Sequence, residues 1–223
     1  MKQRTVVFID YQNVYHRARA AFGQHDANGK CTEPPSFGHV NPLRLGMLLK
    51  QLGEDGGHSR TLTQVRIYRG EPATKKAHPT LQAAFQRQIE SWKREPMLKV
   101  NTRPLRYLPT AWDPTGRPTR WGSGEEKGID VLIALDMVVG AIDDTFDVAV
   151  LVSGDTDLLP AVERVIGVGK RVENAVWWPD HQPGHPLRPK GRSIWCHRLT
   201  SDRFHYLRDD TDYAQVGARS ETL

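Results

Sequence analysis

Four aspartates, each placed where a strand ends or a helix begins, could hold a metal ion. Asp10 ends an apolar run, Asp155 and Asp157 follow a second one, and Asp130 stands at the start of a long apolar segment. Ligands of an open parallel sheet bind outside the carboxyl ends of its strands, so we expect these side chains to converge at one sheet edge. Carboxylates gathered there repel each other unless a cation lies among them. An all-oxygen ligand set selects Mg²⁺ or Mn²⁺ over zinc.

Each of these residues also has an ordinary structural interpretation. Asp10 and Asp157 could cap the helices that follow them, and a negative charge such as Asp130 is favoured near a helix N-terminus. Asn13 is more often a cap or a loop residue than a ligand. Asp155 is harder to explain in this way, because it follows a fully apolar strand and a glycine. The hypothesis of a metal site therefore depends on the joint pattern.

The charge distribution predicts a polyanion-binding surface beside this acidic centre. The formal net charge is +5. Residues 125–163 carry ten acids and one base, Lys127, whereas residues 91–120 and 181–198 are rich in Lys and Arg. Basic surfaces of this kind bind nucleic acids. The alternative is scattered, solvated charge without a partner.

The elements that must position these residues alternate between strand and helix. Apolar and β-branched runs predict strands at 5–10, 64–68, 147–153, 170–177 and 194–199, with a more exposed edge strand at 98–108. Helical spacing predicts helices at 11–21, 43–52, 78–93, 157–167 and 201–207, and a helix at 128–142 that is apolar nearly all round and therefore buried. Glycine and proline predict loops at 23–42, 179–192 and 109–124, the last a candidate flap. This order predicts an α/β fold with a mostly parallel sheet.

Length and composition exclude several classes of protein. A chain of 223 residues with 38% hydrophobic and 26% charged residues suggests one soluble domain, which we assign to residues 1–209, with a loose tail at 210–223. No segment is apolar enough for a membrane span, and the short apolar run after the basic N-terminus is not typical of a signal peptide. Cys31 and Cys196 cannot form a disulfide scaffold, so a reducing, cytoplasmic location is expected. The His and Cys residues lack the paired spacing of zinc sites, and no nucleophile-elbow motif is present.

Three motifs resemble those of a known family. They are Phe8-Ile-Asp10-Tyr-Gln-Asn13, Lys127-Gly-Ile-Asp130-Val-Leu-Ile-Ala-Leu-Asp136 and Val152-Ser-Gly-Asp155-Thr-Asp157-Leu-Leu-Pro160. Together, and in this order, they resemble the NYN domain of the PIN-like nuclease superfamily, which includes the LabA-like bacterial proteins. The resemblance spans residues 4–207, although 20–60 and 105–124 match only in placement. It implies a Rossmann-like three-layer α/β/α sandwich and Mg²⁺- or Mn²⁺-dependent cleavage of RNA.

The resemblance also implies roles for particular residues. Asp10, Asp130, Asp155 and Asp157 match the acidic residues of the family's metal site, and Asn13 matches the Asn expected to orient the site or a bound water. Asp136 also matches the family motif. Six residues along a helix turn it about 240° away from Asp130, so we interpret Asp136 as structural. A further acid, common among relatives, has no clear match here; Glu71 is a weak candidate.

Other matched residues are expected to contact the substrate. Lys127 would neutralise the acidic cluster or touch a phosphate, and Ser153 and Thr156 would line the site. From the basic surface we expect Arg103, Arg106 and Arg120 to bind the RNA backbone. Aromatic residues beside these bases could stack on unpaired bases: Trp92, Tyr107, Trp112, Trp121, Trp177 and Trp178.

Two functional hypotheses follow. The first is a metal-dependent endoribonuclease that hydrolyses phosphodiester bonds of single-stranded RNA, although this chemistry alone does not exclude DNA. The second is a catalytically weak NYN-like module that binds RNA or a regulatory protein. The sequence leaves open a homo-oligomer and the RNA target, and it predicts no membrane partner.

Overall fold

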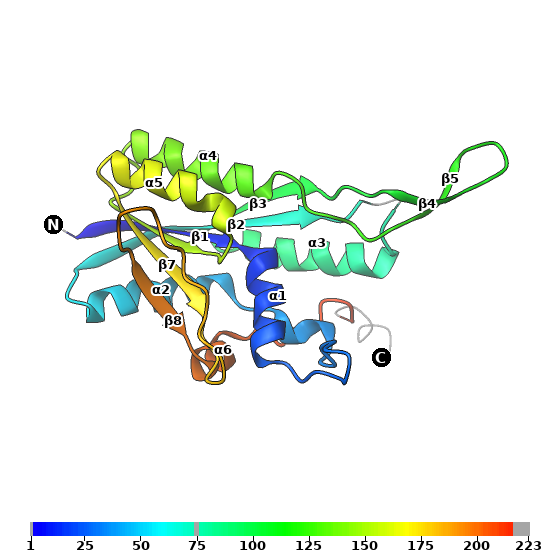
Figure 1. Cartoon of the computed structure of the whole chain (residues 1–223), viewed down its shortest axis with the longest axis horizontal. Coiled ribbons are helices and arrows are strands. Elements are labelled where there is room, and N and C mark those ends of the chain that lie inside the picture. Colours follow the sequence, from blue (N-terminus) through cyan, green and yellow to red (C-terminus); the bar gives the residue numbers. More distant parts are fainter. Residues whose placement is uncertain (1, 74–75, 216–223) are drawn as a thin grey trace.

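Six parallel strands form the central sheet of the computed structural model, which describes residues 2–73 and 76–215. Their order across the sheet is β3-β2-β1-β6-β7-β8 (Figure 1). The strands are β1 (Gln3–Asp10), β2 (Arg60–Glu71), β3 (Leu98–Pro104), β6 (Val148–Val152), β7 (Arg171–Trp177) and β8 (Trp195–Leu199).

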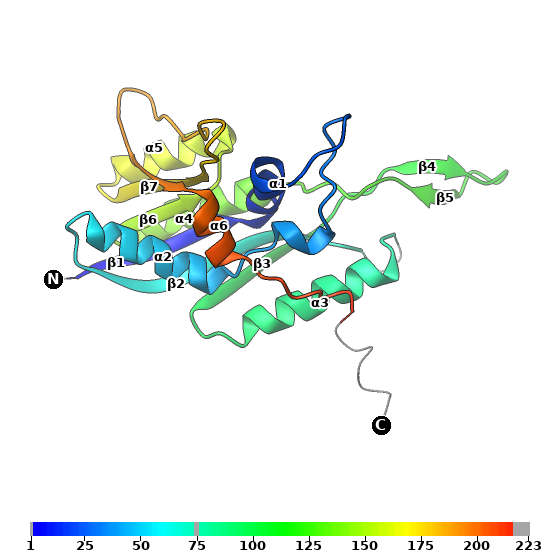
Figure 2. The same ribbon diagram turned by 90° about the horizontal axis from the view of Figure 1, so that it is seen from below.

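Helices cover both faces of this sheet, as Figures 1 and 2 show. One face carries α1 (Tyr11–Phe22), α2 (Pro42–Asp55), α3 (Pro79–Lys93) and α6 (Ser201–Leu207), together with the short 3₁₀ helix η1 (Pro35–Gly38). The other face carries α4 (Ile129–Ile142) and α5 (Leu159–Gly167), which the 3₁₀ turn η2 (Thr156–Leu158) precedes. The predicted three-layer α/β/α sandwich is confirmed.

The composition of β6 follows from this double coverage. Val148, Val150 and Val152 pack into the core on the α1 side, whereas Ala149 and Leu151 pack into the core on the α4 side. A strand that is buried on both faces has no polar position, so it reads as one apolar run.

The order of the strands creates a switch point between β1 and β6. From β1 the chain moves outward to β2 and β3, returns through α4 to β6 beside β1, and then moves outward in the opposite direction. Ile9 pairs with Val152, so Asp10 and Ser153 leave the sheet next to each other. Ligand sites of open α/β sheets lie at such a point.

A hairpin arm, residues 105–124, corrects two predictions. The edge strand expected at 98–108 ends at Pro104, and the segment expected to be a loop at 109–124 contains β4 (Pro109–Trp112) paired antiparallel with β5 (Pro118–Trp121). Figures 1 and 2 show this arm extending far from the sheet. Its prolines and glycines are typical of a loop. In the described part of the chain its two strands pair only with each other, outside the central sheet, so neither needs the apolar run of a buried strand.

Helix α4 differs from its prediction on one face. Ile129, Ile133 and Met137 are buried against the sheet, as expected. The apolar side chains on its outer face are more than half exposed; they are Val131, Leu135, Val139 and Ile142. The prediction of a fully buried helix was therefore wrong, because the described residues place no further layer over α4.

The start of the predicted loose tail is held in place. Tyr213 accepts a hydrogen bond from Arg87 Nε on its carbonyl oxygen (2.6 Å), and its hydroxyl donates to Asp209 (2.7 Å). Tyr213 and Ala214 therefore contact α3, and residues 216–223 lie outside the described residues. Within the described part of the chain no helix is long and apolar enough to cross a membrane.

Candidate metal centre

Asp10 is the buried acid at the centre of the candidate site. It ends β1 and caps α1, since its Oδ1 accepts a hydrogen bond from the Asn13 backbone N–H (3.2 Å). Its Oδ2 accepts one from the Ser153 hydroxyl (2.9 Å), and only 8% of the residue is exposed. The capping interpretation is therefore confirmed, and it is compatible with a site, because the carboxylate sits at the switch point of the sheet.

Burial raises the pKa of Asp10 to about 6, against the hydrogen bonds from Asn13 and Ser153, which lower it. The negative charges of Asp155 and Asp130 raise it further. These three carboxylates, from β1, α4 and the turn after β6, therefore lie within electrostatic range of one another.

A short hydrogen-bond chain fixes the turn after β6. The Ser153 hydroxyl accepts from the Asp155 backbone N–H (3.1 Å), and Asn13 Oδ1 accepts from the Gly154 N–H (3.3 Å). Asp155 in turn caps η2 by accepting from the Asp157 N–H (3.0 Å). The expected cap thus belongs to Asp155, and Asp157 itself is exposed. Asn13 and Ser153 hold the two strand ends together.

Asp130 reaches this edge from the first turn of α4. The N-cap of α4 is Gly128, at φ 72°, a left-handed conformation that favours glycine. The Arg103 guanidinium lies beside that turn, with Cζ 3.6 Å from where a Cβ of residue 128 would stand. The N-terminus of α4 thus presents a carboxylate and a guanidinium together at the edge of the site.

The acids at this edge of the sheet are not arranged as a complete metal-binding site. Within residues 2–73 and 76–215, no group of three or more His, Cys, Asp or Glu side chains is arranged to hold an ion. The donors at this edge are nevertheless all oxygens. Burial, and after it the charges of Asp155 and Asp130, raise the pKa of Asp10, and a cation would stabilise its charged form. The donor set therefore fits Mg²⁺ or Mn²⁺.

Glu126 is an acid of this site that sequence reasoning missed. Its Oε1 accepts a hydrogen bond from the Gly70 N–H (2.5 Å). When the Gln12 side-chain amide is oriented with its nitrogen toward Glu126, that nitrogen also donates to Oε1 (2.6 Å). Burial raises its pKa to about 7, and the charge of Asp10 contributes in the same direction. Its place four residues before Asp130, in the acidic segment, was the signal available in the sequence.

Glu71, the weak candidate for the further acid, is engaged elsewhere. Its carboxylate accepts hydrogen bonds from Thr102 (3.1 Å) and Gln86 (3.3 Å), which tie β2 to β3 and α3. This position at the β2–β3 edge favours a structural role for Glu71 and leaves Glu126 as the better candidate.

Comparison with known proteins agrees with this geometry. The family model described as the NYN domain matches residues 4–188. The chain belongs to the NYN domain family. One solved structure, a protein of unknown function from Vibrio parahaemolyticus, is 22% identical and covers 78% of this chain and 82% of its own, with a TM-score of 0.44. No curated protein matches the chain. Membership places the protein in the PIN-like nuclease superfamily.

In this NYN domain Asp136 is structural, as expected from its helical position. The Tyr68 hydroxyl donates to its Oδ2 (2.7 Å), and Arg66 lies 3.9 Å from the same atom. The pair holds α4 against β2.

The residues predicted to contact substrate separate into groups. Lys127 and Thr156 are exposed at the NYN site. Ser153 is buried, and its hydroxyl forms hydrogen bonds with the Asp10 carboxylate and the Asp155 backbone N–H. Arg106 pairs through its backbone with Glu125 at the base of the hairpin arm, and Arg120 lies on β5.

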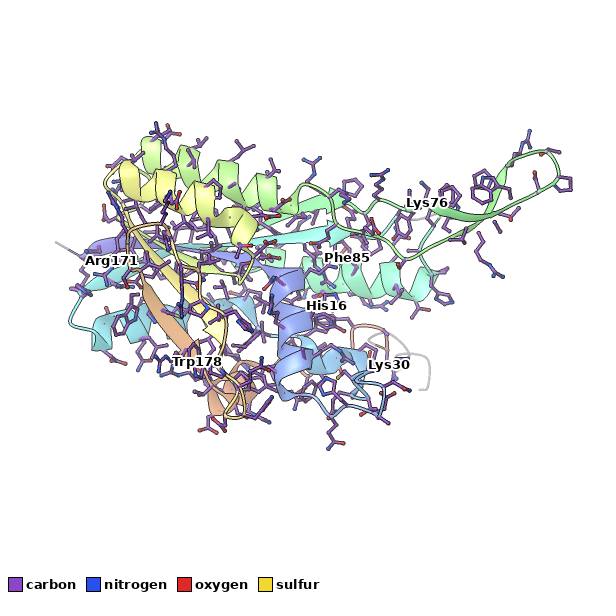
Figure 3. All side chains as sticks on the ribbon, viewed as in Figure 1. His16, Lys30, Lys76, Phe85, Arg171 and Trp178 are labelled. Atoms are coloured by element: carbon purple, nitrogen blue, oxygen red, sulfur yellow. The ribbon has the colours of Figure 1, made fainter. Side chains whose placement is uncertain are left out.

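Half of the aromatic candidates for base stacking are buried. Trp92, Tyr107 and Trp177 are at most 9% exposed, so they are packed inside the protein and are not available to stack on a base. The other three lie at the surface; they are Trp112, Trp121 and Trp178. The Lys76 ammonium lies 4.0 Å from the Trp121 ring centre, and Figure 3 shows Lys76 where the arm leaves the body. The arm therefore presents both aromatic and basic groups.

Proposed function

We propose that this NYN domain is a metal-dependent endoribonuclease that hydrolyses phosphodiester bonds of single-stranded RNA. The observation that carries the proposal is the buried, hydrogen-bonded Asp10, whose pKa is raised to about 6 beside Asp130 and Asp155 at the switch point of the sheet. Buried acids held close to like charges are typical of functional sites. The unpaired cysteines, Cys31 and Cys196, are compatible with the cytoplasmic location that we also propose.

Asp10, Asp130 and Asp155 would hold the cation, with Asp157 completing the set from its exposed position. A bound Mg²⁺ or Mn²⁺ would lower the pKa of a water molecule and stabilise negative charge on the phosphate. Asn13 and Ser153 fix the orientation of the acids through the hydrogen bonds described above.

The remaining groups would accept a proton and bind the phosphate. Glu126, whose pKa of about 7 suits a general base, would take the proton of the attacking water. Lys127 and Arg103, both beside the start of α4, would contact the oxygens of the scissile phosphate. Thr156 would line the approach to it.

The test is a time course on end-labelled single-stranded RNA with Mn²⁺, Mg²⁺ or EDTA, run beside Asp155→Asn purified in the same way. We expect metal-dependent cleavage that falls by at least about 100-fold in the variant, since even outer-shell partners of metal ligands are worth 10- to 100-fold. Equal cleavage by both proteins would point to a contaminating nuclease rather than to this site. A parallel DNA substrate of the same sequence tests the preference for RNA.

A second function is favoured by the hairpin arm, which presents aromatic and basic groups far from the acids. In that case the domain binds RNA, or a regulatory protein, without cutting. Its signature would be RNA binding that weakens steeply with salt while the RNA stays intact in Mn²⁺ and in Mg²⁺.

The hairpin arm makes a separate prediction about RNA affinity. Replacing Arg120 by alanine should remove one phosphate contact, which lowers the slope of log affinity against log salt by about 0.7 for a single strand. Binding titrations at several salt concentrations measure the slope. Arg44→Ala, which removes an exposed charge from α2, is the matched control and should leave it unchanged. An unchanged slope for Arg120→Ala would exclude the arm from the RNA path.

A further inference from the structure

A cavity of about 150 Å³ opens directly beside the candidate metal centre. Its walls come from α1, from the ends of β6 and β7, and from the loop that follows β7. Asn13, Ser153 and Gly154 belong both to this cavity and to the site that orients Asp10. Whatever occupies it therefore lies next to the groups that orient Asp10.

The cavity is formed by the fold itself. The Asn174 amide on β7 donates to the carbonyl oxygens of Leu151 (3.0 Å) and Ser153 (2.9 Å), and its Oδ1 accepts from the Leu187 N–H (2.9 Å). One buried side chain thus ties the loop after β7 to the same strand end that carries the site. On the opposite side, the Trp177 indole donates to the Val14 carbonyl (2.9 Å) and fixes β7 against α1.

The size and lining of the cavity suit one flat ring. The side chains that face it are mostly apolar, including Val14, Ala21, Trp177, Pro183 and Leu199. An apolar cavity of about 150 Å³ is large enough to hold a benzene molecule, which has the dimensions of a pyrimidine ring. Base rings are recognised in proteins by such apolar and aromatic surfaces.

A positive charge stands at the mouth of the cavity. Arg17 is exposed on α1, one turn after Asn13, and its Nε would lie 3.8 Å from a Cβ at Gly154. Among the described residues it has no ion-pair or hydrogen-bond partner. An unpaired guanidinium next to an apolar slot matches a nucleotide, whose ring is apolar on its faces and whose phosphate is an anion.

We propose that this cavity holds one pyrimidine base of the RNA, next to the scissile bond, with Arg17 on the phosphate of that nucleotide. The inference rests on the nuclease function proposed above and adds a base preference to it. It predicts that the protein binds and cuts preferentially beside C or U.

Binding measured in EDTA tests the cavity without requiring cleavage. A short single-stranded RNA is made as a series with one abasic site moved along it, and the affinity of each is measured. We expect one position at which loss of the base weakens binding by about tenfold, in line with stacking energies for single bases. RNAs with a pyrimidine at that position should bind more tightly than RNAs with a purine there.

Substitutions in and outside the cavity test whether the base at that position binds in it. Ala20→Trp, at the exposed rim, should fill the slot and abolish the difference between the intact and the abasic RNA. Ala83→Trp, on the exposed surface of α3, is the matched control and should retain the difference. Arg17→Gln should weaken all the RNAs alike, including the abasic one.

The outcomes separate this inference from the proposed function. Cleavage without any position dependence, or a preference for purines, would overturn the base-binding cavity while the nuclease stands. Position-dependent binding that Ala20→Trp abolishes, in a protein that cuts nothing, would support the cavity and refute the nuclease.

Discussion

Asp10→Asn should abolish RNA cleavage while making the metal-free protein more stable at pH 8. The substitution removes a cation ligand, so we expect activity to fall by at least about 100-fold. It also removes a buried negative charge next to Asp130 and Asp155, whereas an amide can still accept the hydrogen bond from the Asn13 N–H.

The sign of the stability change follows from the raised pKa. The pKa of Asp10 is about 6 in the folded protein against an ordinary value of 3.8, so the folded state binds the proton more tightly. The free energy of unfolding therefore decreases as the pH rises from about 4 to about 6, and the penalty persists above pH 6. The Asp10→Asn variant would escape that penalty, which amounts to roughly 1–3 kcal/mol.

Thermal melts of the metal-free proteins between pH 5 and 8 measure this effect. We expect Asp10→Asn to melt above the wild type at pH 8, and the two curves to approach each other at pH 5. Mn²⁺ should raise the melting temperature of the wild type at pH 8 and leave the variant unchanged, because a ligand stabilises only the state that binds it. Asp202→Asn, which changes an exposed aspartate on α6, controls for loss of charge. A variant that melts below the wild type at pH 8 would show that Asp10 is mainly a structural cap.

The same groups predict the pH dependence of cleavage. Asp10 must be ionised to hold the cation, and Glu126 must be ionised to accept a proton. Activity should therefore rise with pH between about 6 and 7, and Glu126→Gln should remove the upper part of this rise. Initial rates measured from pH 5 to pH 8 at a fixed Mg²⁺ concentration below saturation check this profile.

The sheet and the acids at its edge could be predicted because both leave local signals. β6 is covered on both faces and so is apolar throughout, and the acids that follow β1 and β6 come directly after apolar runs. The convergence of Asp10 and Asp155 follows from the rule that parallel strands share a carboxyl edge, and Asp130 joins them from the first turn of α4.

Features that depend on distant contacts left no such signal. Glu126 becomes part of the site because β2 brings the Gly70 N–H to it. Its place in the acidic segment before Asp130 indicates an acid near the site, but it does not indicate that contact. The two strands of the hairpin arm are exposed or half-buried along their whole length, so they need no apolar run of the kind that marks a buried strand. The outer face of α4 is as apolar as its inner face, so composition alone cannot tell which one is covered.

A second large effect is expected far from the site, at a buried ion network. Arg60 and Glu173, both fully buried, form two hydrogen bonds (2.8 and 2.5 Å), and His197 Nε2 lies 2.8 Å from the same carboxylate. Arg171 also contacts it at 2.7 Å; Figure 3 shows Arg171 at the end of the molecule opposite Lys76. Although burial opposes ionisation, the hydrogen bonds from Arg60 and His197 hold the pKa of Glu173 down to about 2.

Glu173→Gln should destabilise the domain by about 3–5 kcal/mol, because it leaves the Arg60 guanidinium buried without a counter-charge. Urea unfolding at pH 7 measures the loss, with Glu90→Gln, a change at an exposed position, as control. The folded pKa of Glu173 lies below its ordinary value of 4.5, so its contribution is complete above pH 4.5 and is lost as the pH falls toward 2. The difference between wild type and variant should therefore shrink in acid.

A double substitution distinguishes a buried charge from simple loss of packing. Arg60→Met added to Glu173→Gln removes the unpaired guanidinium, so the double variant should be more stable than Glu173→Gln alone. If the double variant loses as much stability as Arg60→Met and Glu173→Gln together, the Arg60 guanidinium is hydrated in Glu173→Gln, and the network is accessible to water. RNA cleavage by any refolded fraction should be unchanged, because the network joins β2, β7 and β8 and contains none of the candidate site residues.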